Sequence, residues 1–166
     1  MPDRREAVEE ALRRAAAEAD AIVTTGGISM GDHDYVREVL EGLGAETAFW
    51  RVLQKPGGPF GLFRLDGKPV FGVPGNPVAA MVMMEEYVRP AIRKMMGFSK
   101  LHRPERQAVL DDGWRKTAPD GKLHFLRVRV EEREGALQAM LTGPQGSGIR
   151  SSMARAGALA LVPEDA

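Results

Sequence analysis

The first part of the chain alternates between segments with a helical spacing of apolar residues and short apolar runs that end in glycine. Apolar side chains recur every three or four positions near the N-terminus and predict an amphipathic helix over residues 4–19. The apolar run 21–23 predicts a buried strand, and Thr-Thr-Gly-Gly at 24–27 predicts a turn after it. The apolar positions that follow predict a second helix over residues 33–43.

Strand-like segments come next, at residues 46–54, 60–65 and 69–73. Turn sequences separate them, with Pro-Gly-Gly-Pro at 56–59 and Asp-Gly at 66–67. These alternating helices and strands predict an α/β sheet.

A long apolar helix is predicted after the last of these strands. Asn76 is a natural N-cap, and Pro77 occupies the first helical position. Pro90 predicts a kink or a break, because proline has no backbone N–H, and Gly97 predicts the end of the helix.

Beyond this helix the spacing changes to that of strands. A polar segment at 101–106 predicts a linker, and residues 124–130 alternate strictly, as a strand with two different faces does. Further strands are predicted at 137–141 and 158–162, with a glycine-rich loop at 143–148 between them.

The patterning therefore predicts two domains. A three-layer α/β domain with a mostly parallel sheet is expected over residues 1–100, and a small β domain, similar to a barrel, over residues 101–166.

Composition narrows the function classes. The 23 Lys and Arg residues balance 23 Asp and Glu residues, so no overall field favours nucleic acid or a membrane surface, and any anion site must be local. The absence of cysteine excludes disulfides, thiolate metal sites and a cysteine nucleophile. No segment approaches the roughly 20 apolar residues of a membrane span, and residues 1–20 are charged and Ala-rich without an apolar stretch, so we expect neither export nor membrane insertion. We expect a cytoplasmic protein.

The arrangement of strand, glycine turn and helix occurs twice, and it presents backbone N–H groups to a phosphate-like anion. Each occurrence alone is equally typical of ordinary turns. Two in one α/β unit favour a ligand site, because ligands bind at the carboxyl ends of parallel strands. The candidate binding residues are Gly26, Gly27, Ser29, Pro74, Gly75, Asn76 and Pro77.

Two acidic residues near the first glycine turn have different interpretations. Asp32 is interpreted as a helix cap, whereas Asp34 could hold Mg²⁺ against a bound phosphate, since Mg²⁺ prefers oxygen ligands. Asp3, with Glu6, has the spacing of a capping box at the start of the first helix.

Basic residues supply the remaining candidates. Arg51 and Lys55 are four residues apart in one predicted strand, so their side chains are expected on the same side. Lys55 is also consistent with a solvated surface lysine. Arg127 and Ser147 would bring a cation and a hydroxyl from the second domain to a tetrahedral oxyanion.

The strings TTGGISMGDHDYVREVL, FWRVLQKPGGP and KPVFGVPGNPVAA resemble, in order and spacing, those of the molybdopterin molybdenumtransferases, the family of MoeA and the gephyrin E domain. HFLRVRV and TGPQGSGIRSS resemble the C-terminal β subdomain of that family. The resemblance implies a MogA-like molybdopterin-binding domain and a homodimer. It also implies insertion of molybdate into adenylylated molybdopterin with Mg²⁺-dependent release of AMP.

The resemblance also assigns roles to individual residues. It implies that Asp34 is the catalytic and metal-binding aspartate and that Lys55 binds the anion. The remaining substrate-binding positions that it implies are Asp3, Arg51, Pro74, Pro77, Arg127 and Ser147. Arg51 departs from the members that have lysine there, and a planar guanidinium binds an oxyanion in a different geometry.

The resemblance leaves two alternatives and one qualification. The chain is also comparable with a molybdopterin adenylyltransferase-like domain, or with a non-catalytic scaffold of the gephyrin E-domain type.

Family members are more than twice as long and begin this region with a further strand. We therefore expect a fragment whose sheet lacks its first strand, whose C-terminal domain is truncated and whose activity alone is weak or absent. A molybdopterin adenylyltransferase is a candidate partner.

Overall fold

The computed structural model divides the chain into two compact units. The first contains Met1–Val52 and Gly57–Leu101, and the second contains Leu53–Pro56 and His102–Ala166. The short segment Leu53–Pro56 thus leaves the first unit and returns to it, which the sequence patterns did not indicate. The structure describes residues 4–29, 35–110, 114–116 and 120–163.

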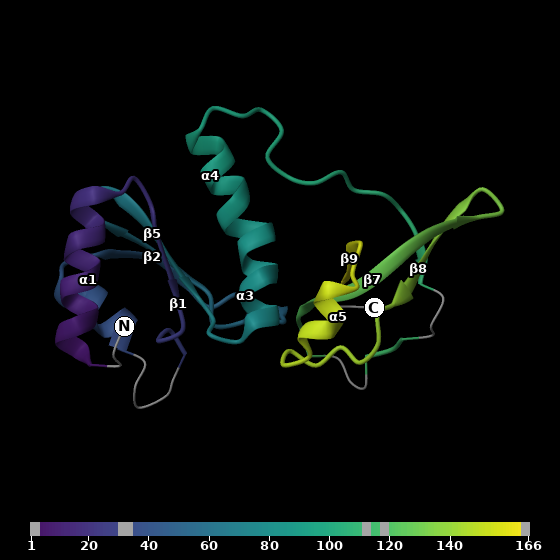
Figure 1. Ribbon diagram of the computed structural model, residues 1–166, viewed down its shortest axis with the longest axis horizontal. Coiled ribbons are helices and arrows are strands. Elements are labelled where there is room, and N and C mark those ends of the chain that lie inside the picture. Colours follow the sequence, from purple (N-terminus) through teal and green to yellow (C-terminus); the bar gives the residue numbers. More distant parts are fainter. Residues whose placement is uncertain (1–3, 30–34, 111–113, 117–119, 164–166) are drawn as a thin grey trace. The chain divides into compact units, whose positions relative to one another are not determined.

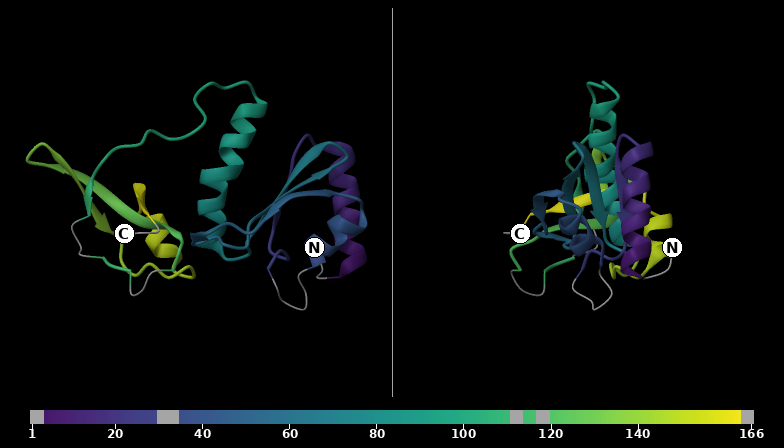
Figure 2. Two further views of the ribbon diagram at one scale, coloured as in Figure 1. Left: turned by 180° about the vertical axis from the view of Figure 1, so that it is seen from behind. Right: turned by 90° about the vertical axis from the view of Figure 1, so that its left-hand side faces the viewer.

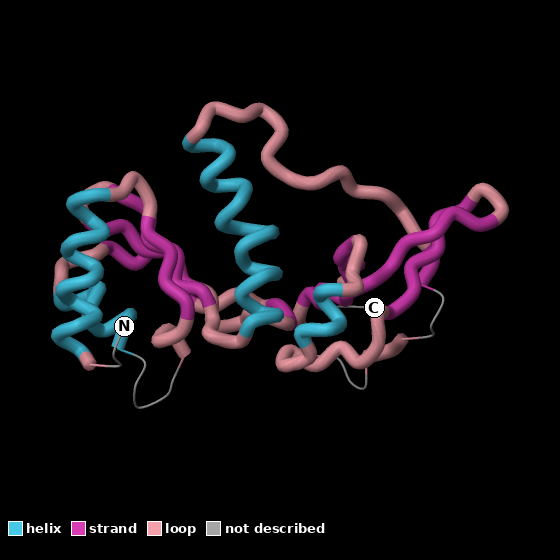
Figure 3. Tube along the Cα trace, viewed as in Figure 1, coloured by secondary structure: helices cyan, strands magenta, loops and turns pink. Residues whose placement is uncertain are grey.

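The first unit is a three-layer α/β structure (Figure 1, Figure 3). Its sheet has the strand order β1-β5-β4-β2. Helices α1 and α2 pack on one face of this sheet, and α3 lies on the other, as the view from behind in Figure 2 also shows. The elements are α1 (Arg5–Glu18), β1 (Ile22–Thr25), α2 (Tyr35–Gly42), β2 (Glu46–Trp50), β4 (Gly61–Leu65), β5 (Lys68–Val73), α3 (Pro77–Met83), the π-helical turn η1 (Met84–Val88) and α4 (Arg89–Met95).

The sheet is mixed, which corrects the expectation of a mostly parallel one. Only the β1–β5 pairing is parallel among the described strands of this sheet, and β4 is antiparallel to both β5 and β2. The cause is the two-residue turn between β4 and β5, where Asp66 and Gly67 both have positive φ angles, of 51° and 78°. Such a turn connects only adjacent antiparallel strands.

Helix α1 buries the apolar stripe predicted for it. Val8, Leu12 and Ala16 are all at most 5% exposed and pack in the core formed with α2 and the sheet. The helix begins at Arg5, with Arg4 as N-cap and no side-chain cap hydrogen bond. Asp3, the predicted capping residue, lies outside the described residues.

The long apolar helix is confirmed, but it is divided in three. Pro90 lacks the N–H that would bond within the helix, and the π-helical turn η1 precedes it and lengthens the local hydrogen-bonding pattern. Gly97, with a φ of 81°, ends α4, where its N–H donates to the Lys94 carbonyl and the Phe98 N–H donates to the Arg93 carbonyl. This is the pattern of a Schellman cap.

The second unit is built around one long strand, β7 (Leu123–Arg133). Val128 pairs with both Leu141 and Ala158, so β8 and β9 lie on opposite edges of β7. Within the described residues these pairings form an open sheet, not a closed barrel. The other elements are β3 (Gln54–Lys55), β6 (Val109–Leu110), β8 (Ala136–Leu141), α5 (Arg150–Ala154) and β9 (Ala158–Val162).

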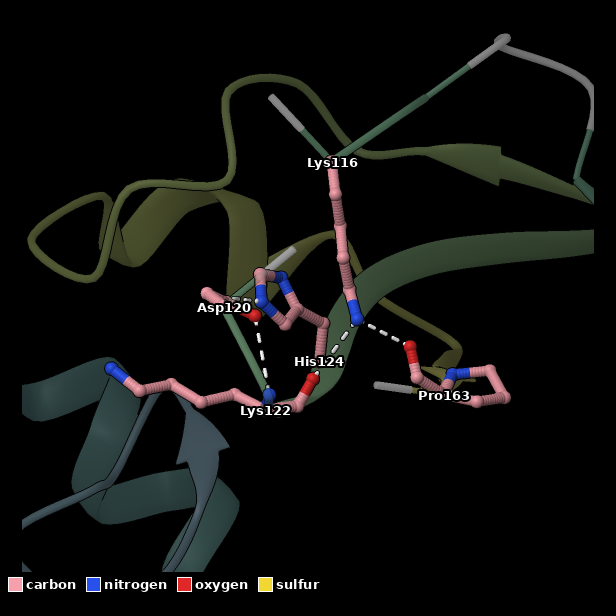
Figure 4. A network of polar contacts seen from close by, with 5 residues as sticks. All are labelled: Lys116, Asp120, Lys122, His124 and Pro163. Atoms are coloured by element: carbon pink, nitrogen blue, oxygen red, sulfur yellow. Dashed lines mark hydrogen bonds and ion pairs between the residues drawn. The ribbon is translucent and has the colours of Figure 1, made fainter. Parts of the chain in front are cut away.

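A polar network fixes the start of β7 (Figure 4). The Asp120 carboxylate contacts His124 Nε2 at 2.8 Å and accepts from the Lys122 N–H at 3.2 Å. Lys116 Nζ donates to the Lys122 carbonyl at 3.1 Å and to the Pro163 carbonyl. The hydrogen bond to His124 is the largest cause of a lowered Asp120 pKa. The network ties β7 to the segment after β9.

The lowered pKa predicts how the second unit responds to acid. A carboxyl group with a depressed pKa stabilises the fold above its unfolded-state pKa, and this contribution is lost as the pH falls through the folded-state pKa. Asp120→Asn should therefore lower the urea concentration at the midpoint of unfolding at neutral pH. The difference in midpoint between this variant and the unaltered chain should become smaller in acid.

The measurement is Trp114 fluorescence, since the Trp114 ring lies 5.3 Å from the His124 ring. Trp50→Phe in the background leaves Trp114 as the single tryptophan, because the chain has 2. Glu132→Gln, on the exposed part of β7, is the control. An Asp120→Asn difference that is unchanged by pH would contradict the role of the carboxylate charge.

Candidate functional site

The two glycine turns predicted to bind an anion lie side by side in the first unit. They follow β1 and β5, which are parallel neighbours, so both turns are at the same edge of the sheet. The Gly26 N–H donates to the Val73 carbonyl at 2.9 Å. A Cβ added at Gly75 would lie 3.2 Å from Gly26 Cα. The structure thus brings the two motifs together at the carboxyl ends of two parallel strands, where ligands of such sheets bind.

Glycine is required at the first turn by both conformation and space. Gly26 and Gly27 have φ angles of 80° and 68°, which other residues rarely adopt. A Cβ at Gly27 would lie 2.7 Å from Val36 Cγ2, and the Gly27 carbonyl accepts from the Val36 N–H at 3.0 Å. The turn is therefore packed closely against the start of α2.

The second turn is fixed by the cap of α3. Asn76 Oδ1 accepts from the Val78 N–H at 3.2 Å, and Pro77 is the first helical residue, which confirms the predicted N-cap. Pro74 is buried, while Gly75 and Pro77 are exposed. Ser29, after the first turn, is exposed as well. In the second turn, the exposed Gly75 and Pro77 therefore lie next to the buried Pro74.

One buried hydroxyl near the first turn is unsatisfied. Thr24 Oγ1 has no hydrogen-bond partner among the described residues. A buried polar atom without a partner costs about 1–3 kcal/mol. Thr24 is on β1, two residues before Gly26, so this unfavourable free energy arises at the edge of the sheet where the two turns meet.

Arg51 and Lys55 do not share a strand, contrary to the prediction. β2 ends at Trp50, and Arg51 has a φ of 76°, which breaks the extended conformation. The Arg51 N–H then donates to the Phe60 carbonyl at 2.8 Å. The alternation of side chains that placed Arg51 and Lys55 on the same side is therefore lost.

Lys55 belongs to the second unit, through β3. It pairs in register with His124 of β7, in a parallel arrangement. Gln54, which sequence reasoning did not single out, is buried and donates from Nε2 to the Pro56 carbonyl at 2.8 Å. The Lys55 side chain is exposed. One unit thus contains Lys55 together with Arg127 and Ser147.

Arg127 is the largest fully buried side chain among those described, at 1% exposure. Its guanidinium donates to Ser152 Oγ at 3.2 Å, the Gly146 carbonyl at 3.1 Å and the Phe125 carbonyl at 3.5 Å. Burial lowers its pKa. No carboxylate pairs with it in the part of the chain that the structure describes, so these neutral acceptors leave a positive charge in the interior.

The same arginine holds the glycine-rich loop on β7. The Arg127 N–H donates to Gln145 Oε1 at 2.8 Å, and Gln145 Nε2 donates to the Arg127 carbonyl at 3.2 Å. Ser147 is exposed on this loop. Gln145 and Ser152 were missed from the sequence because single polar residues in a loop or short helix have no periodic pattern.

A metal site is not formed by the described side chains alone. No group of three or more His, Asp or Glu residues in the described ranges could hold a metal ion. Asp34, the predicted catalytic and metal-binding residue, lies outside the described residues, as do Asp3 and Asp32.

Across the described part of the chain, no helix is long and apolar enough to span a membrane.

Comparison with known proteins identifies both units. Residues 1–94 match the family model for a probable molybdopterin binding domain, and residues 107–166 match that for the MoeA C-terminal region (domain IV). The chain is similar to molybdopterin molybdenumtransferase 2 of Mycobacterium tuberculosis, with 36% identity over 159 residues, 93% of this chain and 38% of the relative. It is also similar to the molybdopterin molybdenumtransferase of Haemophilus influenzae, with 31% identity over 166 residues, 99% of this chain and 41% of the relative.

A solved structure supports the same assignment. The crystal structure of the molybdopterin biosynthesis MoeA protein from Pyrococcus horikoshii OT3 superposes with a TM-score of 0.71 at 26% identity, covering 100% of this chain and 37% of that protein. This chain therefore spans about two fifths of the length of the relatives it matches. It belongs to the family of probable molybdopterin-binding domains and, with its second unit, corresponds to the C-terminal portion of the MoeA-type molybdopterin molybdenumtransferases.

Proposed function

We propose that this chain acts in molybdenum cofactor biosynthesis as part of a molybdopterin molybdenumtransferase, inserting molybdate into adenylylated molybdopterin with release of AMP. The observation on which this mainly rests is the close approach of Gly26 and Gly75, which puts two glycine turns at one edge of the sheet. Backbone N–H groups in such turns suit the phosphate groups of a nucleotide-linked pterin.

The second unit would supply the molybdate contacts. Lys55 is exposed and makes no ion pair with a described carboxylate, so its ammonium is available to an oxyanion. The buried Arg127 is surrounded by neutral acceptors, and its uncompensated charge would attract the same anion. Ser147 would add a hydroxyl from the loop that Arg127 holds. Arg127 thus orders the loop as well as attracting the anion.

Mg²⁺ is the metal that we propose for this site. Mg²⁺ usually binds through one or two carboxylates together with substrate phosphates and water, so a protein cluster of three acidic residues is not required. Asp34, seven residues after Gly27 in the sequence, would supply one such carboxylate. When bound, Mg²⁺ would neutralise the phosphate charge during cleavage of the adenylate.

The same proposal covers location and partners. We expect a cytoplasmic protein that forms a homodimer, with a molybdopterin adenylyltransferase as a candidate second partner. The exposed edge strand β2 is consistent with association. The match of residues 107–166 to the MoeA C-terminal region favours the molybdenumtransferase over an adenylyltransferase-like domain.

The glycine contact predicts a site-specific effect of one methyl group. Gly75→Ala should push the two turns apart, because the new Cβ would meet Gly26 Cα at 3.2 Å. We expect AMP binding, measured by calorimetry on the full chain, to weaken roughly tenfold, as when about one charge-assisted hydrogen bond is lost. Gly42→Ala is the control, since the nearest atom to its Cβ would be 3.9 Å away. Equal AMP affinity in both variants would rule out the turns as the phosphate site.

Molybdate binding tests the second unit. Lys55→Ala should weaken molybdate binding by about 1–3 kcal/mol, the worth of a charge-assisted hydrogen bond. Lys55 is preferred over Arg127 for this test because it is exposed, whereas loss of Arg127 would disturb a buried network. Lys94→Ala, at another exposed lysine, controls for net charge. If Lys55→Ala binds molybdate as the unaltered chain does, the proposed anion role of Lys55 is wrong.

The metal role of Asp34 predicts a selective loss. With AMP bound, the unaltered chain should take up Mg²⁺, and Asp34→Asn should abolish this uptake while leaving molybdate affinity unchanged. The neighbouring Asp32→Asn, at a position interpreted as a helix cap, should retain Mg²⁺ binding. Calorimetric titration of Mg²⁺ into each AMP-saturated protein makes the comparison, and Mg²⁺ uptake by Asp34→Asn would contradict the assignment.

A further inference from the structure

Trp50 joins the glycine turn to the end of β2. Its indole Nε1–H donates to the Ile28 carbonyl at 3.2 Å, across 22 residues of sequence. Ile28 immediately follows the glycine pair and is 1% exposed. In the described part of the chain, no backbone carbonyl accepts from the N–H of Gly27 or Ile28. Trp50 therefore holds a turn in which the N–H groups of Gly27 and Ile28 have no backbone partner among the described residues.

Two arginines lie against the same indole ring. The Arg37 guanidinium carbon is 4.1 Å from the ring centroid, and that of Arg51 is 4.7 Å from it. Both distances are within the range of cation–π attraction, which fixes a guanidinium plane at little entropic cost. Two positive groups are thus positioned on the residue that holds the glycine turn.

The two arginines differ in how their charge is balanced. Arg37 Nε donates to Glu41 at 2.8 Å, one helical turn away on α2. Arg51 pairs with no carboxylate among the described residues, and it stands in a left-handed conformation, with a φ of 76°. Such a conformation is unfavourable for a side chain as large as that of arginine, and it occurs where the surrounding structure imposes it. The three side chains of Arg37, Arg51 and Glu41 therefore carry a net positive charge beside the turn.

The structure offers a simpler explanation for each contact separately. Stacking on a tryptophan shields apolar surface, and an exposed pair such as Arg37–Glu41 is common on helices. Neither explanation accounts for two guanidinium groups on one ring, one of them in a strained conformation, next to the Gly27 and Ile28 N–H groups, which have no backbone partner among the described residues.

We infer that Arg37 and Arg51, held on Trp50, clamp a diphosphate group beside the glycine turn. The inference rests on the proposed function and deepens it, because it assigns a pyrophosphate-class anion to this side of the site. Each guanidinium can bind one phosphate group through two parallel hydrogen bonds. Arg37 is a binding residue and Trp50 is a positioning residue.

The first test compares pyrophosphate with AMP, using calorimetry on the full chain. Arg37→Gln should weaken pyrophosphate binding by roughly 10- to 100-fold and AMP binding by less, because only the diphosphate engages both arginines. Arg13→Gln is a matched control, since Arg13 makes an equivalent exposed pair with Glu9 on α1, at 2.9 Å. It should leave both affinities unchanged.

The second test separates anion binding from a structural role. Glu41→Gln removes the carboxylate that competes for Arg37 and should tighten pyrophosphate binding, by up to about fivefold. A merely structural Arg37 would give no gain. Trp50→Phe keeps an aromatic face but loses the N–H donor, so it should weaken pyrophosphate binding while both arginines remain. Urea unfolding followed by circular dichroism checks that each variant is folded.

The outcomes distinguish this inference from the proposed function. Pyrophosphate affinity that is unchanged in Arg37→Gln, no gain in Glu41→Gln, or no pyrophosphate binding by the unaltered chain would each overturn the clamp. Molybdate binding and its dependence on Lys55 test the proposed function separately, in the other unit. The clamp can therefore fail while the proposed function stands.

Discussion

The close approach of two backbone turns, at Gly26 and Gly75, is the constraint on which the first unit depends. β1 and β5 are parallel neighbours, and the hydrogen bond from Gly26 to Val73 continues their pairing into the turn. A Cβ at Gly75 would lie 3.2 Å from Gly26 Cα, so one turn would have to shift to accept a side chain there. The start of α2 packs closely against the first turn, and α3 begins directly after the second, one helix on each face of the sheet, so the geometry that builds the layers also gathers the backbone donors.

The second unit uses a buried cation for a comparable purpose. Arg127 is satisfied by carbonyl and hydroxyl oxygens, which meet its hydrogen-bonding needs without cancelling its charge. Burying such a charge is costly, as its lowered pKa indicates. An arginine in this state orders the loop of Gln145 and Ser147 and leaves a positive potential there. Structural support for the loop and a positive potential beside it are thus two consequences of one arrangement.

Trp50 shows how one side chain can connect several elements of a site. It stands at the end of β2, donates to the glycine turn at Ile28 and contacts guanidinium groups from α2 and from the break after β2. Phosphate recognition of this kind depends on fixed positions more than on strong individual contacts. A rigid aromatic ring that both stacks and donates a hydrogen bond provides such positions with few rotatable bonds.

The sequence by itself determined the elements whose causes are local: the stripe of α1, the Asn76 cap, the stop at Gly97 and the glycines of the two turns. These depend on spacing, capping and backbone freedom, which neighbouring residues decide. Only the tertiary structure decided that the segment 46–54 divides between two units, that Arg51 and Lys55 do not share a strand and that Arg127 is buried. Each of these results depends on partners far along the chain, Phe60 for Arg51, His124 for Lys55 and Ser152 for Arg127, and no local pattern specifies them.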